Sequence, residues 1–72
     1  MTQPTKEFKL KAEFIELDNL LKAMHVVASG AEAKNFIQAN SVQVNGVIET
    51  RIRRKLTKGD CVELRDERIL IL

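Results

Sequence analysis

The sequence predicts an α+β fold in which two short helices pack on a small, mostly antiparallel sheet. Three patterns support this prediction. Apolar residues alternate near the N-terminus, they then recur with a helical period, and later an Asn-Gly dipeptide separates two short runs rich in valine. Because the chain has only 72 residues, 44% of them hydrophobic, it can bury one small core and form one domain.

The first expected strand follows a polar N-terminal segment. Residues 1–5 include the only proline and show no apolar period, so we expect a flexible tail there and a single domain over residues 6–72. From Phe8 to Phe14 apolar residues alternate with Lys9, Lys11 and Glu13. A period of two is typical of a strand with one buried face, and it places the lysines on the exposed side.

Two helices are expected next. An amphipathic stripe at i, i+3, i+4 and i+7 begins at Leu17 and predicts a helix to about His25. Ser29 and Glu32 have the spacing of a capping box, in which each side chain bonds a backbone N–H of the first turn. This signal predicts a second helix that ends near Asn40.

The remaining chain is expected to form the sheet. Type I′ hairpin turns favour Asn-Gly because both central residues need positive φ, so Asn45-Gly46 predicts a tight hairpin of the flanking valine runs. Later turn signals and apolar runs predict, in order, a turn at Lys58–Asp60, a strand at Cys61–Leu64, a turn at Asp66-Glu67 and a strand at Arg68–Leu72.

Charge is distributed unevenly along a nearly neutral chain. The formal net charge is +2, but between Thr50 and Lys58 lie five cations and no acid. This segment predicts one basic face, which suits a phosphate backbone. The cations of the segment are Arg51, Arg53, Arg54, Lys55 and Lys58.

Composition also excludes several classes of protein. The single cysteine, Cys61, permits no intramolecular disulfide and no cysteine-based zinc cluster. The longest apolar run is much too short to span a membrane, so we expect a soluble, cytoplasmic protein. The sequence contains no motif with the spacing of catalytic, cofactor-binding or metal-binding residues. We therefore expect no enzymatic activity, no cofactor and no metal. With three phenylalanines as its only aromatics, the chain is not expected to form aromatic base-stacking platforms.

A family resemblance rests on the joint order and spacing of short motifs from about Glu16 to Leu64. These residues closely resemble the S4-like RNA-binding module, and the run from Glu49 to Leu56 looks most like its small free-standing bacterial members. The motifs are Leu17-Asp18, Leu20-Leu21, Ser29, Ala33-Lys34, Ile37, Val42-x-Val44-Asn45-Gly46 and Leu56-x-x-Gly59-Asp60-x-Val62.

The resemblance implies RNA binding through a helix pair and the adjoining loop. Many family members carry arginine where this chain has Glu16 and Gly30. We therefore expect the basic contribution to shift toward Lys34 and the segment from Arg51 to Lys58.

The expected RNA-binding residues combine charge with polar groups. Arginine can donate two hydrogen bonds to one phosphate, which ranks Arg51, Arg53 and Arg54 above Lys58 as anchors. Bland alternatives stay open: Ser29 as a helix cap, Asn45 as a turn residue, and Arg51 paired to Glu49 in a solvated loop. The full predicted set is Ser29, Lys34, Gln43, Asn45, Arg51, Arg53, Arg54, Lys55 and Lys58.

The predicted function is recognition of structured RNA, expected to be ribosomal, by backbone and shape contacts of a monomer acting in ribosome assembly or translation. Two alternatives remain. One is a protein-interaction module that docks a partner through a sheet edge or the last strand, Ile69–Leu72. The other is duplex DNA binding by the same cations.

Overall fold

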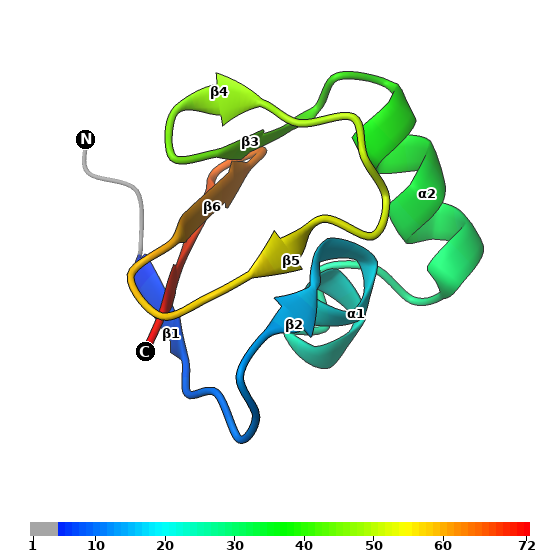
Figure 1. Cartoon of the computed structure of the whole chain (residues 1–72). Coiled ribbons are helices and arrows are strands. Elements are labelled where there is room, and N and C mark those ends of the chain that lie inside the picture. Colours follow the sequence, from blue (N-terminus) through cyan, green and yellow to red (C-terminus); the bar gives the residue numbers. More distant parts are fainter. Residues whose placement is uncertain (1–4) are drawn as a thin grey trace.

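A computed structural model describes residues 5–72 as nine short elements (Figure 1). Most of the expected tail lies outside the described residues, but Thr5, which we assigned to it, opens the first strand. The elements are β1 (Thr5–Phe8), β2 (Ile15–Glu16), α1 (Leu17–Ala23), α2 (Gly30–Gln38), β3 (Val42–Val44), β4 (Val47–Ile48), β5 (Lys55–Leu56), β6 (Cys61–Leu64) and β7 (Glu67–Ile71).

Five strands form the main sheet in the order β1-β7-β6-β3-β4, and β2 pairs with β5 in a separate antiparallel ribbon. Within the main sheet only β1 and β7 run parallel. The predicted α+β class with a mostly antiparallel sheet is therefore confirmed. Because β7 lies between β1 and β6 and has no open edge, the alternative in which Ile69–Leu72 docks a partner through its edge does not fit this sheet.

The helices cover one face of the main sheet, as Figure 1 shows. Alternate residues of the central strands point into this layer and are buried, which is the period of two expected of a sheet with one covered face. The buried core consists of Leu17, Leu20, Leu21, Val27, Ala33, Ile37, Val42, Val44, Leu56, Val62, Leu64, Ile69 and Ile71. No helix of the described residues is long and apolar enough to cross a membrane.

The predicted strand from Phe8 to Phe14 is wrong in position. The strand ends at Phe8, and residues 9–14 form an irregular loop in which Phe14 is 40% exposed. β1 pairs with β7, and its last pair joins Phe8 to Ile71, the last residue of β7. Two further hydrogen bonds continue the ladder, from Leu72 N–H to the Phe8 carbonyl (2.8 Å) and from Leu10 N–H to the Leu72 carbonyl (2.9 Å). The apolar alternation of residues 8–14 therefore extends beyond the end of β7, the strand with which β1 pairs.

Both helices form where the sequence places them, though each ends early. α1 stops at Ala23 because His25 adopts a left-handed conformation (φ 58°), and Asn40 (φ 60°) follows the end of α2. The Ser29 hydroxyl accepts a hydrogen bond from Glu32 N–H (3.2 Å), which confirms the predicted cap.

The Asn45-Gly46 hairpin is confirmed, with positive φ at both residues (53° and 83°). The Asn45 side chain also joins this turn to β6: its amide oxygen accepts from Cys61 N–H (2.9 Å) and its amide nitrogen donates to Asp60 (3.0 Å). The turn before β7 falls at Arg65-Asp66, one residue earlier than predicted, because Leu64 pairs directly with Glu67.

Candidate nucleic-acid interface

The predicted basic segment begins in the connection from β4 to β5 and continues through β5 to Lys58, and its backbone fixes it to the helical layer. The N–H groups of Leu17 and Asp18, at the start of α1, donate to the carbonyls of Arg54 (2.9 Å) and Ile52 (3.1 Å). These carbonyls replace a side-chain cap, because Glu16 at the N-cap makes no capping hydrogen bond. Lys55 then enters β5 and pairs with Glu16 of β2. The cations are thus carried on a braced segment.

Glu49 is the organising residue of this segment. Its side chain is only 8% exposed, and it accepts hydrogen bonds from Arg51 N–H (2.9 Å), from Arg51 Nε and Nη2 (3.1 and 3.0 Å) and from Arg54 Nη1 (2.8 Å). A buried carboxylate needs such partners to remain charged. Sequence reasoning considered the Arg51 pair, which is confirmed, but missed Arg54 and the burial of Glu49.

The arginines hold Glu49 ionised. Hydrogen bonds from the Arg51 side chain outweigh the opposing effect of burial, and with those from Arg54 they lower the pKa of Glu49 to about 2. The same pairing raises the pKa of Arg51. Two of the predicted anchors therefore spend part of their hydrogen-bonding capacity inside the protein. The Arg51 side chain is still 73% exposed, whereas that of Arg54 is 28% exposed.

Three other cations of the segment lie on the surface. Within residues 5–72, Arg53 and Lys58 take part in no ion pair, and both are exposed. The Lys55 ammonium lies 4.9 Å from the centroid of the Phe14 ring, which orders the lysine without neutralising it. Lys58 shares a hollow of about 470 Å³ with Lys9, a cation that the strand prediction did not connect with the basic segment.

The predicted residues of α2 occupy its start and its exposed surface. Ser29 uses its hydroxyl in the cap, and Lys34 is exposed. Sequence reasoning missed Lys22: its ammonium lies 3.8 Å from the position that a Cβ on Gly30 would take. The last turn of α1 therefore places a cation beside Gly30. This contact joins two helices across a loop, so no pattern of neighbouring residues in the sequence indicates it.

The two predicted polar residues of β3 and its turn differ in their surroundings. Gln43 is exposed and pairs with Glu63 of β6 on the uncovered side of the sheet. Asn45 uses both ends of its amide within the fold, as described above. Asp60, which receives one of those bonds, also accepts from Thr57 N–H (2.8 Å). Burial alone would raise the pKa of Asp60, but the hydrogen bonds from Thr57 and Asn45 outweigh it and the pKa is lowered.

Comparison with known proteins agrees with this architecture. A family model described as the S4 domain matches residues 8–72. A Bacillus subtilis protein named "Probable ribosome maturation protein RlbA" is 40% identical over 55 residues, which cover 76% of this chain and 78% of the relative. YbcJ of Escherichia coli is 42% identical over 52 residues, covering 72% of this chain and 74% of the relative.

A solved structure extends the likeness to the whole fold. The solution structure of E. coli YbcJ, described as revealing an alfaL motif involved in RNA binding, matches with a TM-score of 0.69 and 32% identity. The match covers 100% of this chain and 90% of YbcJ. These comparisons confirm the predicted S4-like fold and the prediction that the chain is not an enzyme. The chain belongs to the S4 domain family.

Proposed function

We propose that residues 6–72 act as one domain that binds structured RNA through a basic face. The observation that carries this proposal is the braced segment from Arg51 to Lys58, whose backbone is fixed to α1 and β2 while its cations reach solvent. A fixed array of cations binds a phosphate backbone at less cost in conformational entropy than a flexible run would. The names of the relatives, which refer to RNA binding and ribosome maturation, support the same conclusion.

The geometry changes the order in which we expect the residues to contribute. Arg53, Lys55 and Lys58 carry unneutralised charge, and they become the main phosphate contacts. Arg51 adds a contact while its other side stays on Glu49, and Arg54 mainly holds the segment in place. Flanking contacts are assigned to Ser29, Lys34 and Lys22 around α2, with Gln43 and Asn45 beyond them.

The target we propose is ribosomal RNA, bound in the cytoplasm by a monomer that assists ribosome assembly or translation. The name of the B. subtilis relative supports this assignment. The site consists mainly of cations, so we expect it to contact the RNA backbone rather than to read the base sequence.

Binding across a salt series tests the proposal. With three to five phosphate contacts, the logarithm of the association constant should fall with the logarithm of salt concentration at a slope of about −2 to −4. Fluorescence anisotropy with a structured rRNA fragment, and matched duplex DNA as competitor, measures both affinity and preference. Equal competition by DNA would indicate general binding of nucleic acids, and lack of RNA binding at low salt would overturn the proposal.

A protein-docking function has one observation in its favour. β4 is an edge strand, and its residues Val47 and Ile48 are 69% and 51% exposed. Exposed apolar residues on an open edge are suited to pairing with a strand from a partner. This function predicts a complex that is insensitive to salt and independent of the basic segment.

A further inference from the structure

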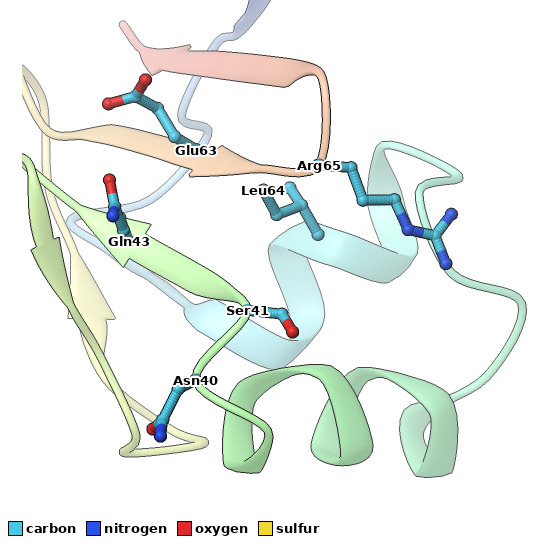
Figure 2. A pocket seen from close by; sticks show the side chains of 6 residues that line it. All are labelled: Asn40, Ser41, Gln43, Glu63, Leu64 and Arg65. Carbon is cyan, nitrogen blue, oxygen red and sulfur yellow. The ribbon is translucent and has the colours of Figure 1, made fainter.

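Two adjoining hollows lie away from the basic segment, beside α2 and the uncovered side of the sheet; Figure 2 shows the residues that line the first of them. One, of about 200 Å³, is bordered by Gln43 of β3 and Glu63 of β6. The other, of about 450 Å³, runs along α2 past Asn35 and Phe36. Both are lined by Ser41 and Arg65, so they meet at these two side chains, and we call them together the Arg65 depression. Figure 2 shows Ser41 where the chain passes from α2 into β3, and Arg65 extending from the end of β6 toward the helical side of the molecule.

Arg65 is held in a defined orientation at this depression. It occupies the turn between β6 and β7 with positive φ (52°), and its side chain extends from this turn toward the helical layer (Figure 2). Its guanidinium carbon lies 4.2 Å from the centroid of the Phe36 ring. An aromatic ring packed against a guanidinium restricts its motion, so less conformational entropy is lost when a second planar group stacks on the opposite face.

The groups around Arg65 suit a nucleobase better than a phosphate. Glu32 and Glu63 border the two hollows, and their charges oppose entry of an anion. Asn35 and Ser41, which line the same hollow as Arg65, supply hydrogen-bond donors and acceptors, and Gln43 supplies more in the adjoining hollow. An amide side chain can pair with the N6 and N7 edge of adenine, and unpaired RNA bases commonly stack on arginine.

We propose that this depression binds one unpaired base of the RNA, stacked on the Arg65 guanidinium with its edge facing Asn35 and Ser41. This inference rests on the proposed RNA-binding function and deepens it. The basic segment holds the backbone of a structured RNA, and the Arg65 site selects RNAs in which a bulge or loop offers a free base. The platform is a guanidinium over a phenylalanine, which supplies the stacking surface that the low aromatic content did not lead us to expect.

Three RNA duplexes test this site: one fully paired, one with a single bulged adenosine, and one with an abasic residue at the bulge. Stacking of one base predicts that the protein binds the bulged adenosine about tenfold more tightly than the other two. Arg65→Lys keeps the charge and the backbone requirement of the turn but removes the planar group. We expect this variant to lose the preference and to bind the paired duplex within about twofold of the unaltered protein.

Lys11→Ala is the matched control, because Lys11 is an exposed cation on the distant 9–14 loop, and it should retain the preference. The unfolding midpoint of Arg65→Lys should equal that of the unaltered protein within error. A lost preference then reflects binding and not loss of folding. Retention of the bulge preference by Arg65→Lys, or equal binding of all three duplexes by the unaltered protein, would overturn the site but leave the proposed function standing. Failure to bind any duplex at low salt would overturn both.

Discussion

Replacement of Arg53 and Lys58 together by alanine is expected to weaken binding to structured RNA by about 10- to 100-fold at low salt. Both side chains are exposed, and neither is in an ion pair within the described part of the chain, so the variant removes two phosphate contacts and little else. The salt slope should become shallower by about 1.4 to 1.8, since each contact contributes about 0.7 to 0.9. Anisotropy titrations at several salt concentrations measure both quantities.

The control for this experiment is Lys6→Ala combined with Lys11→Ala, which removes the same charge from β1 and the loop that follows it. Lys6 pairs with Glu67 at the surface, where such pairs contribute at most about 1 kcal/mol to stability. We expect the control to bind RNA within about twofold to threefold of the unaltered protein. If both double variants lose affinity equally, net charge and not the basic segment governs binding.

Glu49→Gln is expected to destabilise the domain by about 2–3 kcal/mol. The carboxylate is buried and accepts four hydrogen bonds from Arg51 and Arg54. A neutral amide loses the charge attraction, and it presents a donor toward groups that are themselves donors. Because the free energy of unfolding of a native protein is only about 5–15 kcal/mol, this loss is large. Urea unfolding followed by circular dichroism measures it.

The pH dependence of stability checks the same residue independently. The pKa of Glu49 is lowered from the ordinary 4.5 to about 2. Its contribution is therefore complete above about pH 4.5 and is lost as pH falls through about 2. The difference in the free energy of unfolding between the unaltered protein and Glu49→Gln should narrow over this range.

Glu63→Gln is the control variant. It weakens an exposed pair with Arg68 and should lower the free energy of unfolding by under about 1 kcal/mol. Equal stability of Glu49→Gln and the unaltered protein would contradict the role assigned to Glu49.

This role of Glu49 determines which cations give an interpretable binding experiment. Charge reversal at Arg51 or Arg54 would place a second carboxylate beside the buried one, so loss of RNA binding would be confounded with loss of folding. Arg53 and Lys58 avoid this difficulty.

Elements coded by neighbouring residues could be predicted from the sequence. The Asn45-Gly46 hairpin and the Ser29 cap each need only a few adjacent residues, and both form as predicted. β1 could not be placed correctly, because the end of its partner β7, and not its own pattern, determines where it stops. β5 was missed because Lys55-Leu56 resembles a continuing basic run, and it becomes a strand only by pairing with β2.

The candidate site divides in the same way. Its cations could be identified from the sequence because they are consecutive, whereas their availability depends on tertiary contacts. The burial of Glu49 beneath Arg51 and Arg54 separates neutralised from unneutralised arginines. Lys22 reaches Gly30, and Arg65 reaches Phe36, only because the fold brings distant segments together. Neither contact could be inferred from sequence spacing.

The most direct test of the central claim is an NMR titration of the labelled protein with a fully paired ribosomal RNA duplex. We expect the largest amide shift changes in residues 51–58 and at the start of α2, and smaller changes along β1. Changes centred on Val47 and Ile48 of β4, with residues 51–58 unaffected, would contradict the basic-face account and favour the sheet edge as the binding surface.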